Sequence, residues 1–206
     1  MTRAFLPLIA LLFLWPVPLR AADGPEEFLS KLLASDFAGD MEPRHDHVLY
    51  RDGRYIHEAC VHEECAERRE NFYPATDPLI IVTQWRVVGT RMDSPTKALI
   101  TVRYRLIATA EGRNWDRKIV PMVEPRDEDV IYRVWRHKGQ WLWVDPPPIA
   151  RVGYEGVRAA VAEEIAEQER LLKGDPNRDD WRQILGLYRD ELAALDALEP
   201  LASANR

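Results

Sequence analysis

The chain has 206 residues, of which 46% are hydrophobic and 30% charged, and its formal net charge is −6 at pH 7. This length suits a single domain with an apolar core, and the composition is that of a globular protein, not a disordered one. The negative charge argues against a nucleic-acid-binding protein, because such a protein needs a basic face. Composition therefore restricts the class of protein without naming a function.

The amino terminus has the layout of a secretory signal peptide. Arg3 is followed by an uncharged apolar run over residues 4–19, then by Arg20, two alanines and an acidic stretch. The run of 16 residues is shorter than the ~20 that a spanning helix needs, and its three prolines disfavour such a helix. We expect residues 1–22 to be removed and the mature protein to be periplasmic or secreted, with no membrane span. The alternative is an uncleaved membrane anchor.

The next segments are predicted to be one helix and one irregular stretch. Between residues 26 and 37, apolar side chains recur every three or four positions, which is typical of an amphipathic helix. Pro25 suits the first turn of that helix, and Gly39 suits its end. Residues 40–78 show no such period, and they hold both cysteines and four of the five histidines.

A block of strands is predicted next. In residues 98–110 the side chains alternate, so one set should face the core and the other should face water. The side chains predicted to face the core are Ile100, Val102, Tyr104 and Leu106, and those predicted to face solvent are Thr101, Arg103 and Arg105. Residues 79–91 form a further predicted strand, residues 114–123 an extended piece, and residues 129–137 and 141–144 a hairpin around Lys138-Gly139-Gln140.

The carboxyl end is predicted to be a helical hairpin. Apolar stripes run over residues 154–172 and from Asp179 or Asp180 to Leu198, with a Gly-Asp-Pro-Asn break between them. Helices segregated from an antiparallel sheet define the α+β class. We therefore expect a curved antiparallel sheet covered by an N-terminal helix and followed by a C-terminal helical hairpin. The expected units are the signal peptide, an α+β domain over residues 23–150, and the hairpin over residues 151–206.

The closing strands carry a resemblance. Residues 130–147 read as a basic and apolar strand, a glycine turn, and then Trp141-x-Trp143-x-Asp145, followed by prolines. This stretch resembles the last hairpin of the nuclear transport factor 2-like superfamily, also called cystatin-like cones. In outline the resemblance covers residues 26–148, and the helical hairpin after Pro148 lies outside it. It implies a curved sheet and a helix that enclose a conical pocket.

The cysteines suggest a disulfide or a metal site. Cys60 and Cys65 are the only two cysteines, and in an oxidising compartment they would most simply be joined to each other. Five residues of straight helix would hold their Cα atoms too far apart for a bridge, so the bridge requires a bent backbone. The alternative is a copper or zinc site formed by His57, Cys60, His62 and Cys65. The spacing matches no established zinc signature, and apart from this alternative no cofactor is expected.

A catalytic pair is a further hypothesis. A two-residue turn at Lys138-Gly139 would place His137 opposite Gln140 and, further along, Tyr132 opposite Asp145. Isomerases of the cone fold use a tyrosine hydroxyl beside an acid, so the resemblance implies the same roles for Tyr132 and Asp145. The alternative, non-catalytic interpretation of this pair is a structural hydrogen bond. The pairing also depends on the register, because a slip of one residue would place both side chains on the other face.

Charge and aromatic content suggest binding. Residues 79–150 have twelve basic and eight acidic side chains, whereas the segments on both sides are acidic. Docking between these parts explains the pattern, and so does an anionic ligand on the sheet. Trp85, Trp135, Trp141 and Trp143 would line a cone for an apolar ligand, or would simply pack in the strands.

Three functions are therefore left open. The first is an exported binding or interaction module without catalysis, whose partner is a small apolar or anionic molecule or an envelope protein. The second is a cone-fold isomerase or hydratase using Tyr132 and Asp145. The third is periplasmic copper or zinc handling. The sequence does not fix the oligomeric state.

Overall fold

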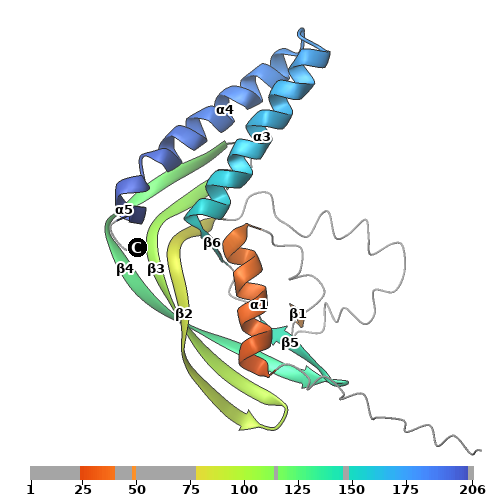
Figure 1. Cartoon of the computed structure of the whole chain (residues 1–206), viewed down its shortest axis with the longest axis vertical. Coiled ribbons are helices and arrows are strands. Elements are labelled where there is room, and N and C mark those ends of the chain that lie inside the picture. Colours follow the sequence, from red (N-terminus) through yellow and green to blue (C-terminus); the bar gives the residue numbers. More distant parts are fainter. Residues whose placement is uncertain (1–23, 40–47, 50–77, 114–115, 146–148, 204–206) are drawn as a thin grey trace, which may run out of the picture.

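The computed structural model describes residues 24–39, 48–49, 78–113, 116–145 and 149–203. Helices and a curled sheet make up this part of the chain, so the predicted α+β class is confirmed (Figure 1). The elements in chain order are α1 (Pro25–Ala38), β1 (Val48–Leu49), β2 (Leu79–Ser94), β3 (Lys97–Arg113), β4 (Asp116–His137), β5 (Gln140–Val144), β6 (Ala150–Gly153), α3 (Tyr154–Gly174), α4 (Asp179–Asp196) and α5 (Glu199–Ser203).

The sheet is mixed: the strands expected between residues 79 and 145 pair antiparallel as predicted, and a short parallel strand that was not predicted is added at each edge. Its six strands run in the order β1-β5-β4-β3-β2-β6. The four central strands pair antiparallel, but β1 pairs parallel to β5 and β6 pairs parallel to β2. Both exceptions are short strands at the edges of the sheet, of two and four residues, and their brief patterns give no signal of direction.

Helix α1 packs on the sheet through its apolar stripe. Leu29, Leu32 and Leu33 are buried in a cluster with side chains of β2, β3, β4 and β5, hereafter the α1 cluster. The helix begins at Pro25, whose missing N–H is harmless in a first turn. It ends at Gly39, where a φ of 89° permits the left-handed cap that bonds back to Asp36 and Ser35.

Strand β3 alternates as predicted. Ile100, Val102, Tyr104 and Leu106 are all buried and belong to the α1 cluster, whereas Thr101, Arg103 and Arg105 are partly exposed. Beyond Leu106 the register of β3 shifts against both of its neighbours. From that bulge onward, the buried residues of β3 belong to a second cluster under the helical hairpin. The bulge therefore marks the point where the core passes from one group of helices to another.

Strand β4 is one continuous element of 22 residues, although the sequence indicated two separate pieces. Pro121 and Pro125 delimit the stretch where β4 has additional residues relative to β3, since Ala108 pairs with Pro121 and Leu106 pairs with Arg126. Proline cannot donate to a ladder, and a bulge is where a strand tolerates it. The prolines therefore bend the strand without ending it.

The β4–β5 hairpin has the predicted register. His137 pairs with Gln140, and Lys138 and Gly139 form the turn with φ values of 46° and 87°. Two successive positive φ values are the geometry of a type I′ turn, which matches the right-handed twist of the paired strands.

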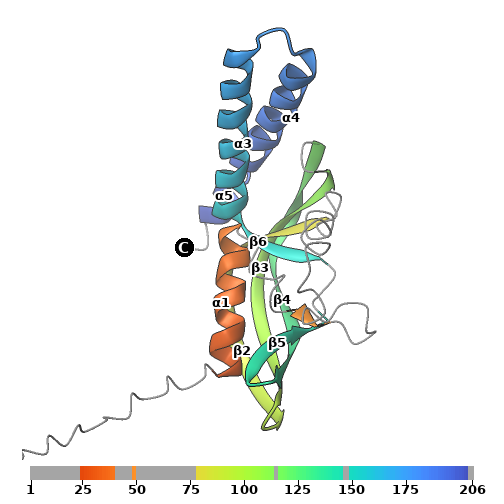
Figure 2. The ribbon, with the colours of Figure 1, turned by 90° about the vertical axis from the view of Figure 1, so that its right-hand side faces the viewer.

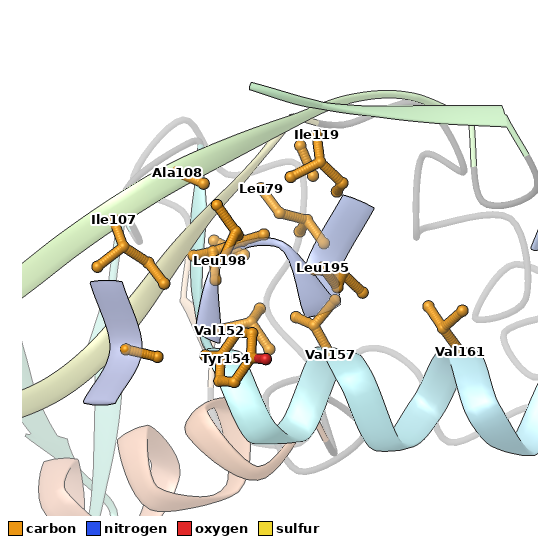
Figure 3. Packing of buried hydrophobic residues seen from close by; sticks show 14 of the residues in the cluster. Leu79, Ile107, Ala108, Ile119, Val152, Tyr154, Val157, Val161, Leu195 and Leu198 are labelled. Atoms are coloured by element: carbon orange, nitrogen blue, oxygen red, sulfur yellow. The ribbon is translucent and has the colours of Figure 1, made fainter. Parts of the chain in front are cut away.

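Helices α3 and α4 pack against each other and against the part of the sheet beyond the β3 bulge (Figure 3). Val157 and Val161 of α3, Leu195 of α4, and Leu198 between α4 and α5 are buried against the sheet. The sheet side of this cluster is supplied by Leu79, Ile81, Ile107, Ala108, Ala110, Ile119, Ala150 and Val152.

The end of α1 lies directly against the start of α3 (Figure 2). A Cβ atom built on Gly156 would lie 2.6 Å from the carbonyl carbon of Ala38 and 2.7 Å from the carbonyl oxygen of Phe37. Contacts this short with backbone atoms are not tolerated, so glycine is required for the two main chains to approach this closely.

Candidate binding surface

The pairing of β4 and β5 does not extend to the predicted catalytic pair, Tyr132 and Asp145. The β4–β5 register holds as far as Arg133 opposite Val144, one pair short of Tyr132 and Asp145. At Asp145 the backbone takes a φ of 46°, in the left-handed region. The regular ladder that was expected to bring the two side chains onto one face therefore ends before it reaches them.

Tyr132 is a buried core residue whose hydroxyl is already engaged. It is 3% exposed, and its hydroxyl lies 2.6 Å from the hydroxyl of Tyr104, which is 2% exposed. Its ring packs on Trp143, with 5.3 Å between the ring centroids. Burial, with the neighbouring Tyr132 as a lesser cause, raises the pKa of Tyr104 well above its ordinary value. The Tyr104 hydroxyl therefore stays protonated at neutral pH, and the pair acts as a hydrogen bond within the core.

Charged groups surround the tyrosine pair. Arg151 of β6 has a side chain that is 8% exposed, and its guanidinium carbon lies 5.4 Å from the centroid of the Tyr104 ring. It donates hydrogen bonds to Glu128 Oε1 at 2.9 Å and to the Ile149 carbonyl at 3.2 Å. Asp36 of α1 is 2% exposed, and its charge contributes to the raised pKa of Tyr104. Arg151 therefore links β6 to β4 through Glu128 and lies beside the Tyr104 ring, and the buried Asp36 adds a negative charge from α1 on the same side of the sheet.

The predicted tryptophan lining is divided between core and surface. Trp141 and Trp143 are buried in the α1 cluster, and Trp85 is partly buried against it. The ammonium group of Lys97 lies 4.5 Å above the ring of Trp135, which is partly exposed. The indoles therefore do not form one common lining.

The proposed metal and disulfide residues, His57, Cys60, His62 and Cys65, lie outside the described residues, as do residues 1–22. Within the described residues, no three potential ligands from His, Cys, Asp and Glu lie together as a metal site would require. The described helices also include none that is long and apolar enough to cross a membrane.

A surface that the sequence only hinted at lies on the side of the sheet opposite the α1 cluster. The register of β2, β3 and β4 aligns the outward side chains into rows, because paired residues point to the same face. We call this surface the arginine face. Its rows, from β2 to β4, are Gln84–Arg105–Asp127, Arg86–Arg103–Asp129, Gly89–Thr101–Ile131 and Arg91–Leu99–Arg133.

Two arginines of this face are held by aspartates. Arg103 donates to both carboxylate oxygens of Asp129, at 2.6 and 2.7 Å, and Arg105 donates to Asp127 at 3.1 Å. The bidentate bond raises the pKa of Arg103 and lowers the pKa of Asp129. The two bonds orient the guanidinium plane of Arg103, whereas Arg105 is held to its aspartate by one bond.

The other arginines leave the face with excess positive charge. Within the described residues, Arg86 and Arg133 are exposed and have no acidic group at ion-pairing distance. Arg86 lies directly opposite Arg103, an arrangement of like charges that costs stability in a sheet. Ile131, 59% exposed, follows Asp129 by two residues and precedes Arg133 by two. An exposed aliphatic side chain among arginines is typical of protein interfaces.

Sequence reasoning found half of this surface. The alternation of residues 98–110 identified Arg103 and Arg105 as solvent-facing, and the basic charge of residues 79–150 left two explanations open, docking against the acidic segments and an anionic ligand on the sheet. Arg86, Asp129 and Arg133 lie beside these two arginines because of the register between the strands. That register cannot be read from a single sequence.

Comparison with known proteins gives no relationship. No protein-family model matches the chain, and neither a curated protein nor a solved structure has significant similarity to it.

Proposed function

We propose that this protein is an exported, non-catalytic binding module that docks an acidic surface of a partner protein on its arginine face. The observation that carries the proposal is the exposed Ile131, which lies between Asp129 and Arg133 along β4 and diagonal to Arg103 of β3, on a face whose β2 strand adds Arg86. Arg86 and Arg133 have no ion-pair partner among the described residues. Arginine is favoured at protein interfaces because its planar group binds carboxylates in two places at once.

The mixed charge of the face favours a protein over other anionic partners. Asp127 and Asp129 lie within the basic surface, and they would repel a uniformly negative membrane or nucleic-acid backbone. A protein surface can complement both signs, with acids opposite Arg86 and Arg133 and a basic group opposite Asp127. The acidic character of the remainder of the chain also supports a local interaction over general attraction to polyanions.

Export and fold relationship belong to the same proposal. The charged start, short apolar run and polar continuation of residues 1–27 support delivery to a periplasmic or extracellular space, where an envelope protein is a natural partner. The packing of α1 against a curled sheet and the β4–β5 register are compatible with a cystatin-like cone over residues 26–148. The engagement of Tyr132 with Tyr104 favours binding over proton transfer by Tyr132.

The test uses a fluorescently labelled peptide that carries several glutamates and one lysine, so that it can complement both the arginines and Asp127 of the arginine face. Its binding to the mature protein is followed by fluorescence anisotropy at low and at physiological salt. R86E and R133E are compared with K173E, which makes the same charge change at an exposed lysine near the tip of the helical hairpin. We expect each sheet variant to weaken binding about threefold to tenfold, from the loss of one exposed ion pair and its replacement by repulsion.

Two results would overturn the proposal. Equal weakening by K173E would show that net charge governs the binding, and not the arginine face. Tighter binding to vesicles containing phosphatidylglycerol than to the peptide, with the same sensitivity to R86E and R133E, would identify the face as a membrane-binding surface instead.

A further inference from the structure

We propose that the partner adds an extended acidic segment as a new strand along the free edge of β2, residues 84–94. This inference rests on the proposed function and specifies how the partner is held. It joins three observations about one strand: an edge without a neighbouring strand, exposed apolar side chains on it, and its position as the first strand of the arginine face.

The edge is open over most of its length. On one side β2 pairs with β3 along the whole strand, from Leu79 to Ser94. On the other side it pairs with β6 only from Leu79 to Val82. Among the described strands none lies beyond residues 84–94 on that side, and Figure 1 shows β6 accompanying only the start of β2. An edge of this length presents backbone donors and acceptors to any extended chain that aligns with it.

The side chains on this edge are suited to a partner. Val88 and Met92 are 40% and 48% exposed, two of the five large hydrophobic residues exposed in the described part of the chain. Edge strands are usually protected by burial or by inward charges, so apolar exposure here is unexpected for a solvated edge. Thr90 donates to Glu26 of α1 at 2.7 Å, so the helix approaches the edge at Thr90.

The charges on β2 select the kind of strand. Alternate residues of an added strand point to the same face, so acids at every second position would extend the rows of the arginine face beyond Arg86 and Arg91. The new strand would thus place its carboxylates next to Arg86, which has no acidic partner at ion-pairing distance among the described residues. Apolar or small residues at the intervening positions of the added strand would point to the opposite face of the sheet, which carries the α1 cluster.

A second copy of this chain fits the edge poorly. An antiparallel pair of β2 strands centred between Val88 and Gly89 would set Arg86 of each copy opposite Arg91 of the other. Arg91 is already paired with Asp93 at 3.0 Å, so the second copy would offer Arg86 no free carboxylate. The open edge is therefore suited to a short acidic segment of another protein.

The experiment uses three forms of one peptide of sequence Glu-Val-Glu-Thr-Glu-Val-Glu with the mature protein. One form is unmodified, one is N-methylated at the glutamates, and one is N-methylated at the valines and threonine. Successive N–H groups of a strand point to opposite edges, so only one methylated form blocks the bonds to β2. We expect that form to bind at least tenfold more weakly than the parent peptide and the other to bind within about twofold of it.

Hydrogen exchange with mass spectrometry gives the second readout, with the R86E and K173E variants measured in parallel. The parent peptide should slow exchange of amides within residues 84–94, and R86E should remove this protection while K173E retains it. If both methylated peptides bind as well as the parent and R86E still weakens binding, strand addition is wrong and the arginine face remains the docking surface. If the parent peptide does not bind, or binds with equal loss in R86E and K173E, both proposals fail.

Discussion

Glu191 of α4 should make the stability of the fold fall as the pH rises. Its carboxyl group is buried between the helical hairpin and the sheet, with the residue 3% exposed, and it lies 3.5 Å from the guanidinium of Arg117 in β4. Burial raises the pKa of Glu191 from 4.5 to about 7, although Arg117 acts in the opposite direction. Tyr188, one turn earlier on α4, has a raised pKa to which Glu164 of α3 and Glu191 both contribute after burial.

The sign and size follow from the linkage of protonation and folding. Because the folded state holds the proton up to a higher pH than the unfolded state, the free energy of unfolding is greatest below pH 4.5 and falls as the pH rises towards the folded pKa, about 7. Between about pH 5 and about pH 7.5, this single group should remove about 2 kcal/mol. Glu191→Gln keeps the size of the side chain and cannot ionise, so it should abolish this part of the pH dependence.

Urea unfolding at both pH values provides the assay. The wild type should lose about 2 kcal/mol more than Glu191→Gln between the two conditions, and this difference cancels the contributions of all other titrating groups. Glu163→Gln on the exposed side of α3 is the matched control and should follow the wild type. If Glu191→Gln shows the same fall as the wild type, or if the wild type gains stability relative to it, the assignment of a raised pKa is wrong.

Three further predictions concern other parts of the chain. Tyr132→Phe should lower the free energy of unfolding by about 1–2 kcal/mol in urea titrations, since it leaves the buried Tyr104 hydroxyl without this partner; an unchanged midpoint would contradict the hydrogen bond. Alkylation of the folded, mature protein without reductant should label neither Cys60 nor Cys65, because an exported chain with two cysteines most simply joins them; two reactive thiols, especially with bound copper or zinc, would favour the metal site. Mass spectrometry of the mature amino terminus should show the loss of about residues 1–22, and an intact Met1 in the membrane fraction would refute the signal peptide.

Elements with a clean period were predictable from the sequence. The alternation that buries Val102 and exposes Arg103 is visible in the residues themselves, and so are the apolar stripes of α3 and α4. The register of β4 and β5 was also predictable, because a two-residue turn at Lys138-Gly139 determines which residues of the two strands pair. The positive φ values of both turn residues agree with that turn. In these places local pattern and final structure agree.

The features that were not predictable depend on contacts between residues that are distant in sequence. Pro121 and Pro125 indicate breaks when read locally, and only the bulge against β3 accommodates them within one strand. Strand β6 follows three prolines and has four residues, too few for a period, and it forms because β2 offers a parallel partner there. The candidate surface was hidden for the same reason, since Arg86 and Asp129 become neighbours of Arg103 through pairing alone.

The close approach of α1 to α3 at Gly156 bears on how the molecule can be cut or redesigned. The α1 cluster and the second cluster, under the helical hairpin, involve different stretches of the sheet. This alone would suggest that either α1 or the hairpin could be deleted without affecting the other. Yet the main chain of Phe37 and Ala38 rests directly on the first turn of α3, with no side chain between them to adjust. A shortened chain that lacks α1 would leave that turn exposed, and a side chain at residue 156 would push the helices apart. The helical hairpin is thus expected to be held less firmly on the sheet in chains that lack α1, although its own cluster still binds it there.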